Sequence, residues 1–239
     1  MPNHSSPSSS PQKTIPYHIG FIIDGNRRWA RAKGLPTLIG HQKGIKRIEE
    51  IMEYAQKSGV KIVTIYAFST ENWKRSKKEV AYLMQLFENF ATNQINVAAK
   101  SGVQIKILGN PKKLPESLQK TLQKVVESTK NNQKIIVNVA LNYGGRDEIV
   151  RTFRKLTTLG VKTEEITEEL INQNLDTAGL PDPDFIIRTS GEQRLSNFLP
   201  WQATYSELYF PQVCWPDFDK KQFDLAILEF QKRQRRLGK

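Results

Sequence analysis

The chain has 239 residues, of which 38% are hydrophobic, and this suffices for the core of one α/β domain or of two small domains. Lysine and arginine outnumber aspartate and glutamate by 36 − 24 = 12, so the chain favours anionic partners: nucleic acid, an anionic membrane surface or phosphorylated small molecules. The single cysteine, Cys214, excludes an internal disulfide framework and any metal site built from several cysteines. No apolar run reaches the ~18 residues that a transmembrane helix requires.

The N-terminal segment MPNHSSPSSSPQK is rich in serine and proline and has no apolar core. We therefore expect residues 1–14 to form a disordered tail and not a signal peptide. Residues 15–239 should fold as a single domain. The protein should be cytoplasmic, and a peripheral contact with a membrane surface stays open.

Short β-rich runs alternate with longer helical patterns along the chain. The predicted strands cover residues 18–23, 61–68, 103–108, 134–141 and 184–188, with 207–210 as a candidate sixth strand. The predicted helices cover residues 45–56, 78–100, 115–130, 146–158, 167–175 and 219–236. This alternation predicts an α/β fold with a mainly parallel central sheet of about six strands, covered by helices on both faces.

Polar motifs directly follow the predicted strands. They are DGNRRW (24–29), STENWKR (69–75), NYGGR (142–146) and RTSGEQRLSNF (188–198). Ligands of such folds bind beyond the carboxyl ends of the strands. The sequence therefore predicts one ligand site, built from these motifs at a single edge of the sheet.

The first motif is typical of a strand-to-helix turn that binds phosphate. Gly25 lets backbone amides approach a ligand, and the following helix offers free N–H groups at its positive end. Arg27 and Arg28 add charge. Asp24 either binds a Mg²⁺ that bridges to the phosphate or caps the helix. Neither GxxxxGK[ST] nor GxGxxG occurs, so nucleotide binding has little support.

The motif RTSGEQRLSNF is the most informative segment. Arg188 and Arg194 stand beside the hydroxyl residues Thr189 and Ser196. Guanidinium forks and hydroxyls match the oxygens of a diphosphate, which take bidentate and charge-assisted hydrogen bonds. Glu207 follows shortly and could hold the Mg²⁺ that accompanies a diphosphate. The ordinary alternative is a surface loop with solvated arginines.

Three further features have two interpretations each. Trp73 either lines an apolar pocket or belongs to the ordinary core. His41, in GHQKG, either donates to a phosphate or is structural. The predicted helix 78–100 is apolar over a wide face, which indicates either core packing or the wall of a hydrophobic tunnel.

Together these motifs make the sequence resemble the cis-prenyltransferase family, the isoprenyl diphosphate synthases typified by undecaprenyl diphosphate synthase. The resemblance covers residues 17–237 and rests on HIGFIIDGNRRWA, GHQKG, YAFSTENWKR, NYGGR and RTSGEQRLSNFLPWQATYSELYFPQVCWPDF. It implies a Mg²⁺-dependent transferase that repeatedly condenses isopentenyl diphosphate onto an allylic diphosphate, here farnesyl diphosphate, with Z double bonds. The implied product is a Z-polyprenyl diphosphate, a precursor of an undecaprenyl-like lipid carrier.

The resemblance also implies roles for individual residues. Asp24 matches the essential Mg²⁺-binding aspartate, and Asn72 matches a catalytic residue tied to proton removal. Because a neutral amide is a poor base, we expect Asn72 to orient the group that takes the proton. Glu207 matches a second Mg²⁺ carboxylate, which can come from the partner subunit of a homodimer. The remaining expected substrate-binding residues are Gly25, Asn26, Arg27, Arg28, Trp29, His41, Ser69, Thr70, Glu71, Trp73, Arg75, Arg188, Arg194, Leu195 and Ser196.

One position departs from the family pattern. Many members carry arginine four residues before the histidine of GH, where this chain has Thr37. One contact to the allylic diphosphate is then lost or supplied by a neighbour. Ala67 is small, which suits an already elongated allylic starter.

Two rival functions make different predictions. The net charge and QKRQRR near the C-terminus favour a nucleic-acid-binding protein, but no RRM, KH or helix-turn-helix pattern occurs, so we expect no nucleic acid partner. A phosphatase-like α/β enzyme would release phosphate without a second substrate. A trans-type synthase is disfavoured, because the sequence lacks DDxxD and is not all-helical.

Overall fold

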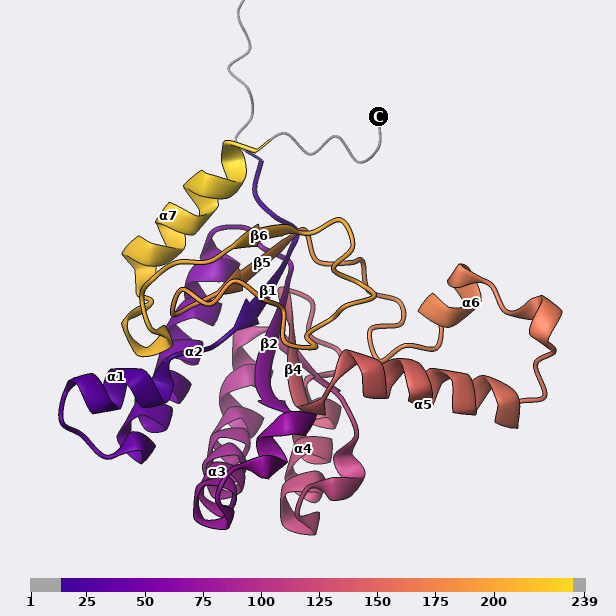
Figure 1. Ribbon diagram of the computed structural model, residues 1–239, viewed down its shortest axis with the longest axis horizontal. Helices are drawn as coiled ribbons and strands as arrows, with labels where there is room; N and C mark the ends of the chain where they lie inside the picture. Colours follow the sequence, from indigo (N-terminus) through magenta and orange to yellow (C-terminus); the bar gives the residue numbers. More distant parts are fainter. Residues whose placement is uncertain (1–13, 234–239) are drawn as a thin grey trace, which may run out of the picture.

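The computed structural model describes residues 14–233, which form one parallel sheet with helices packed against it (Figure 1). Residues 1–13 of the expected tail and the last residues of the predicted C-terminal helix lie outside the described residues. No helix in the described part of the chain is both long and apolar enough to cross a membrane.

Within residues 14–233 the sheet has six strands, and every neighbouring pair is parallel. The order is β3-β4-β2-β1-β5-β6. This confirms the predicted fold class, and each strand ends within about two residues of its predicted position, the usual uncertainty of such boundaries. The strands are β1 (His18–Ile22), β2 (Ile62–Ser69), β3 (Val103–Leu108), β4 (Ile135–Tyr143), β5 (Phe185–Arg188) and β6 (Glu207–Tyr209).

The helices follow the predicted alternation, with two differences. One helix begins at Thr37 and not at residue 45, because glycines interrupt its apolar pattern over the first two turns. A short helix precedes it where only a turn into a helix was expected. The helices are α1 (Asn26–Ala32), α2 (Thr37–Lys57), α3 (Lys77–Ser101), α4 (Glu116–Thr129), α5 (Gly145–Thr158), α6 (Glu168–Asn172) and α7 (Lys220–Gln231), and a 3₁₀ turn, η1 (Thr70–Lys74), follows β2.

Alternate side chains of the strands divide the core between the two faces of the sheet. On one face, Ile19 and Phe21 of β1 pack with residues of α2 and α7. The same face extends over β3, where α3 and α4 cover it. The opposite face is covered by Phe198 and Leu199, which belong to a loop. The structure therefore confirms a sheet flanked by helices, and a loop contributes to the cover of this face.

A buried polar chain crosses the middle of the sheet. Asn138 donates to Thr64 Oγ1 at 2.8 Å, and His18 Nε2 lies 2.8 Å from the same hydroxyl. His18 Nδ1 lies 2.8 Å from the carbonyl of Pro181, which can only accept, so Nδ1 carries the hydrogen. Nε2 then accepts from the Thr64 hydroxyl, and the ring is neutral. Burial lowers the pKa of His18 from 6.5 to about 4.

This histidine should make the stability of the fold pH-dependent. The pKa of His18 is lower in the folded than in the unfolded chain, so its contribution is complete above pH 6.5 and is lost as the pH falls towards 4. A shift of this size corresponds to about 3 kcal/mol. Urea unfolding between pH 7.5 and 4.5 should show a steeper loss of stability in the wild type than in His18→Gln. Equal slopes would contradict the assignment, whatever the absolute stability of the variant.

Candidate active site

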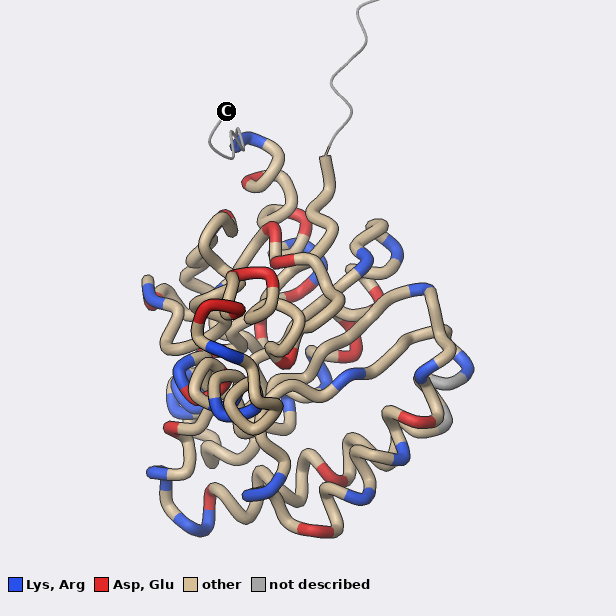
Figure 2. Tube along the Cα trace, turned by 90° about the vertical axis from the view of Figure 1, so that its right-hand side faces the viewer, with Lys and Arg blue, Asp and Glu red and all other residues tan. Residues whose placement is uncertain are grey.

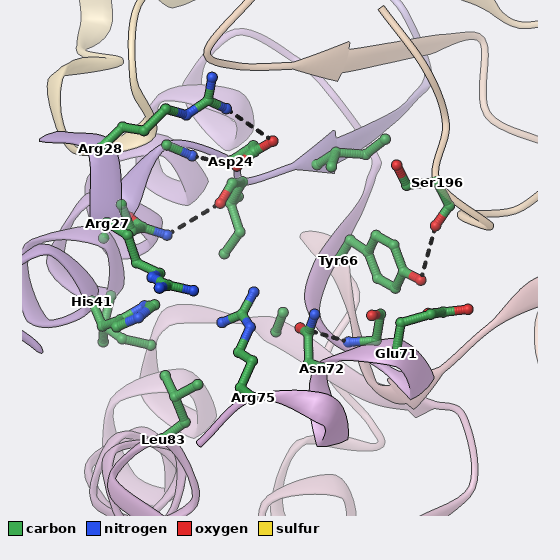
Figure 3. Close-up of a pocket in the computed structure, with 18 of the residues that line it drawn as sticks. Asp24, Arg27, Arg28, His41, Tyr66, Glu71, Asn72, Arg75, Leu83 and Ser196 are labelled. Atoms are coloured by element: carbon green, nitrogen blue, oxygen red, sulfur yellow. Dashed lines mark hydrogen bonds and ion pairs between the residues drawn. The ribbon is translucent and has the colours of Figure 1, made fainter. Parts of the chain in front are cut away.

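A cavity of about 800 Å³ opens at the carboxyl edge of the sheet (Figure 3). Its walls come from the segments that follow β1, β2 and β5 and from α2 and α3. The fold thus brings together most of the residues that the sequence singled out. Those lining the cavity are Asp24, Gly25, Asn26, Arg27, Arg28, His41, Ser69, Glu71, Asn72, Arg75, Arg188 and Ser196.

The cavity combines cationic and apolar walls. Figure 3 shows the side chains of Arg27, His41 and Arg75 turned toward the same part of the cavity, with Leu83 beneath them. The other apolar lining residues include Ile22, Ile23, Ile45, Ala67, Leu86 and Phe87. Such a lining can bind a molecule with an anionic head and an apolar body.

Asp24 directly follows β1 and is held by two arginines. Its Oδ2 accepts from Arg188 Nη2 at 2.8 Å and lies 3.3 Å from Arg28 Nη2, while Oδ1 accepts from Gly25 N at 2.6 Å. Burial alone would raise the pKa of Asp24, but the hydrogen bond from Arg188 and the other contacts outweigh it and lower the pKa. The carboxylate is therefore ionised at neutral pH. It does not cap α1, because the N-cap is Gly25.

Arg188 ends β5 and is only 4% exposed. Besides Asp24, it binds the carbonyl of Arg194 at 2.6 Å and Ser196 Oγ at 2.7 Å. Its Nε is buried without a hydrogen-bond partner within the described residues. Arg188 thus fastens the turn after β5 to the end of β1.

Glu79, in the first turn of α3, is a residue that the sequence interpretation missed. Its carboxylate lies 3.3 Å from His41 Nε2, 3.3 Å from Arg75 Nη1 and 3.7 Å from Arg27 Nη1. The only indication in the sequence is S-x-x-E, which predicts a capping box. Ser76 does accept a hydrogen bond from the Glu79 N–H, as in a capping box. The Glu79 carboxylate points to Arg75 and Arg27 and not to the backbone of Ser76. Burial, together with the charge of Arg75, lowers the pKa of His41.

Asn72 lies in η1 and is fixed by the end of β2. Its Oδ1 accepts from the backbone N–H of Ser69 at 3.1 Å, so the amide nitrogen is left to other groups. The hydrogen bond engages one lone pair of the amide oxygen and orients the side chain at the wall of the cavity.

Several predicted residues lie outside the cavity lining. Trp29 and Trp73 are anchored by their indole N–H groups, to Asp217 at 2.8 Å and to Asn142 at 2.7 Å. Trp73 also packs edge-on against Phe68 and is partly buried at the margin of the core. The remaining residues outside the lining are Thr70, Arg194, Leu195 and Glu207.

Glu207 is not brought to Asp24 within this chain. It begins β6 opposite Phe185, the first residue of β5, whereas Arg188 ends β5 near Asp24. Its carboxylate pairs with Arg233 at 2.9 Å. Among the described residues, no group of three or more His, Cys, Asp and Glu side chains could hold a metal ion.

The motif GHQKG is explained by the contact of α2 with α1. A Cβ on Gly40 would lie 2.0 Å from the carbonyl oxygen of Asn26, and one on Gly44 would lie 2.4 Å from Asn26 Oδ1. The two helices can approach this closely only without side chains at these positions. The contact fixes Asn26 and its neighbours at the cavity.

Replacing Gly40 by alanine should therefore destabilise the protein. Alanine favours an isolated helix, but here its Cβ would collide with a backbone carbonyl and separate α1 from α2. Overpacking of this kind costs about 2 kcal/mol. Urea denaturation should detect the loss, with Lys43→Ala, on the exposed side of α2, as the matched control. An unchanged midpoint for Gly40→Ala would show that the helices can move apart freely.

The comparisons with known proteins agree on one family. A family model described as putative undecaprenyl diphosphate synthase matches residues 22–238. The chain belongs to the undecaprenyl diphosphate synthase family. The isoprenyl transferase of Lactococcus lactis subsp. lactis is 44% identical over 231 residues, covering 95% of each chain. That of Fusobacterium nucleatum subsp. nucleatum is 47% identical over 227 residues, covering 95% of this chain and 97% of its own.

Two solved structures share the fold. Lavandulyl diphosphate synthase from Lavandula x intermedia, in complex with dimethylallyl diphosphate, has a TM-score of 0.90 at 34% identity, covering 94% of this chain and 99% of its own. A probable undecaprenyl diphosphate synthase from Campylobacter jejuni has a TM-score of 0.80 at 31% identity, covering 95% and 100%. The resemblance found in the sequence is confirmed, and the protein is a prenyltransferase.

Proposed function

We propose that residues 15–239 form a catalytic domain that condenses isopentenyl diphosphate repeatedly onto an allylic diphosphate, with farnesyl diphosphate as starter. The product would be a Z-polyprenyl diphosphate, a precursor of an undecaprenyl-like lipid carrier. The observation that carries the proposal is the cavity, which joins a cluster of arginines to an apolar wall. The relative from Lavandula x intermedia, solved with dimethylallyl diphosphate, supports a prenyl diphosphate as ligand.

In the proposed reaction the allylic C–O bond breaks and its electron pair leaves with the diphosphate. The alkene of isopentenyl diphosphate then attacks the allylic carbon, and a proton is lost. Arg27, Arg28 and Arg75 would bind the allylic diphosphate and stabilise the charge that develops on it. Arg188 and Ser196 would bind isopentenyl diphosphate, and Arg194 could join them if its exposed side chain turns inward.

The residues present fit a Mg²⁺ ion that is bound together with the substrate. Mg²⁺ is usually held by one or two carboxylates plus substrate phosphates, and Asp24 is an ionised carboxylate at the cavity. When bound, the ion would neutralise charge on the leaving diphosphate. Glu207 can contribute only from a partner subunit or after a rearrangement, since its own Asp24 lies at the other end of the strands.

The cavity lining supports the proposed starter and indicates which residues would replace the missing arginine. Thr37 does not line the cavity, whereas Arg27 and Arg31 do, so we assign the lost diphosphate contact to these neighbours. Ala67, like Phe87, lines the cavity, and its small side chain supports an elongated starter. The same wall supports the tunnel interpretation for one face of α3.

A homodimer is proposed from the position of α5, which projects from the body of the protein in Figure 1. Val150, Phe153 and Leu159, in α5 and just after it, are 47%, 42% and 65% exposed, and a second copy of the chain would cover them.

Lys and Arg are interspersed with Asp and Glu over the described residues seen in Figure 2, and not gathered in a single stripe. This distribution favours small anionic substrates over nucleic acid. We also propose a cytoplasmic location with peripheral membrane contact.

The test is an incubation of the purified protein with labelled isopentenyl diphosphate, farnesyl diphosphate and Mg²⁺, with and without EDTA. A ladder of extractable lipids that disappears with EDTA would establish the reaction, the metal requirement and the product length. Phosphate release without isopentenyl diphosphate would favour a phosphatase. If no lipid forms with farnesyl, geranyl or dimethylallyl diphosphate, the proposal that this chain is an enzyme without another subunit is overturned.

A further inference from the structure

Asn197 connects three segments at the cavity, and none of the roles above uses it. Its Nδ2 donates to Glu71 Oε1 at 3.0 Å. Its Oδ1 accepts from the backbone N–H of Arg146 at 2.9 Å, and its carbonyl accepts from that of Gly145 at 2.8 Å. The side chain is therefore fully oriented, with the amide nitrogen directed at one carboxylate.

Two of these contacts cap α5 from a distant part of the chain. The N-cap of α5 is Gly144, which has no side chain to accept hydrogen bonds from the first turn. The first N–H groups of a helix have no partner inside it. Asn197, 51 residues from Arg146 in sequence, provides the acceptors.

The glycines of NYGGR make room for this contact. A Cβ on Gly144 would lie 2.8 Å from Asn197 Nδ2, and one on Gly145 would lie 2.0 Å from Pro200 Cδ. The motif does not line the cavity, so its residue types are explained by the docking of the segment around Asn197.

The turn that carries Asn197 is strained and needs this support. Ser196, Asn197 and Leu199 have φ angles of 49°, 69° and 48°, in the left-handed region. Each such residue costs about 1–2 kcal/mol, with asparagine among the most tolerant. Tyr66 also binds the carbonyl of Ser196, at 3.3 Å, so the turn is held from both sides.

The third contact reaches η1. Figure 3 shows Glu71 on the same side of the cavity as Ser196. Burial alone would raise the pKa of Glu71, but hydrogen bonds, first that from Asn197, outweigh it and lower the pKa. Glu71 is thus an ionised carboxylate that is held by the Asn197 amide and by the hydroxyls of Ser69 and Thr70 beside it.

We propose that Asn197 is a positioning residue for the isopentenyl diphosphate half of the site. Its side chain fixes the position of Glu71, on η1, relative to the turn that carries Ser196. The start of α5 supports Asn197 through the hydrogen bond from Arg146. Both polar atoms of the Asn197 side chain bind other protein groups, which argues for a positioning role at the cavity wall. The inference rests on the proposed function, since it assumes that this half of the cavity binds isopentenyl diphosphate.

The first test is Asn197→Asp, which keeps the acceptor for Arg146 but sets a second carboxylate against Glu71. We expect kcat/KM for isopentenyl diphosphate to fall ~30-fold, the size of loss seen when an orienting partner is removed. The KM for the allylic diphosphate should change by less than ~3-fold, because the allylic half of the site is not disturbed. Asn110→Asp is the matched control, because its side chain caps a surface turn by accepting from Lys112 at 3.1 Å, and it should leave both constants unchanged.

The second test is a double-mutant cycle with Glu71→Gln. In Asn197→Asp/Glu71→Gln one amide and one carboxylate still face each other, with the direction of the hydrogen bond reversed. If Asn197 acts through Glu71, the loss in the double variant should be at least ~5-fold smaller than the product of the two single losses.

The outcomes separate the inference from the proposed function. An unchanged kcat/KM for isopentenyl diphosphate in Asn197→Asp, or losses that multiply in the cycle, would overturn the inference while the wild type still makes lipid. A wild type without prenyl transfer would overturn the proposed function instead. Thermal unfolding of each variant identifies a loss caused only by misfolding, and Asn197→Gly, which tolerates the positive φ, then replaces Asn197→Asp in the comparison.

Discussion

Replacement of Asp24 by asparagine should reduce kcat ~10³-fold, which is the size of loss expected when a group that stabilises developing charge is removed. The amide keeps the shape of the side chain but carries no charge. Asp24 is the carboxylate that lines the cavity beside Arg188 and Arg28, and hydrogen bonding keeps it ionised. The measurement is the initial rate of lipid formation at saturating substrates over a range of Mg²⁺ concentrations.

The control for this prediction is Asp219→Asn. Asp219 caps α7 by accepting from Gln222 N at 3.0 Å, and asparagine is an equally good cap. Its rate should match the wild type. Full activity of Asp24→Asn at every Mg²⁺ concentration would remove Asp24 from the proposed metal site, and circular dichroism would show whether an inactive variant is folded.

Replacement of Arg188 by lysine should impair both stability and the binding of isopentenyl diphosphate. A single ammonium group cannot reach Asp24, Ser196 and the carbonyl of Arg194 together, whereas the guanidinium binds all three. Loss of hydrogen bonds to a charged, buried group costs about 2–4 kcal/mol. Urea denaturation and the KM for isopentenyl diphosphate, raised ~10-fold or more, are the two measurements.

Arg194→Lys provides the contrast for stability within the same turn. The Arg194 side chain is 58% exposed and pairs with Glu192 at the surface, where an ion pair contributes at most ~1 kcal/mol. Its unfolding midpoint should stay close to that of the wild type. Equal destabilisation by the two substitutions would show that Arg188 does not fasten the turn to β1.

The strands and most helices were predictable because each is marked by a pattern of residues that are neighbours in the sequence. Apolar runs such as residues 18–23 and 103–108 are short and bounded by polar residues, which is sufficient to identify buried strands. The start of α2 was missed because Gly40 weakens the apolar pattern there, and it is in the helix only because it must approach Asn26. The loop that covers the second face carries no periodic pattern at all.

The candidate site was predictable to the extent that its residues follow strands directly. Asp24 and Arg188 lie together because they stand at the carboxyl ends of two adjacent parallel strands, β1 and β5. The motifs around Trp29 and Trp73 do not reveal the partners of their indole N–H groups, because these partners lie 188 and 69 positions away in the sequence.

The sequence by itself determined the family, the parallel sheet and the set of charged groups at its carboxyl edge, because strand patterns and contiguous motifs depend on neighbouring residues. Only the tertiary structure decided which groups act on each other. Glu79 meets His41 across 38 positions, and Asn197 meets Glu71 across 126. Such pairs are chosen by the packing of whole elements, since a carboxylate or an amide has no preference for a partner until the fold brings one within about 3 Å.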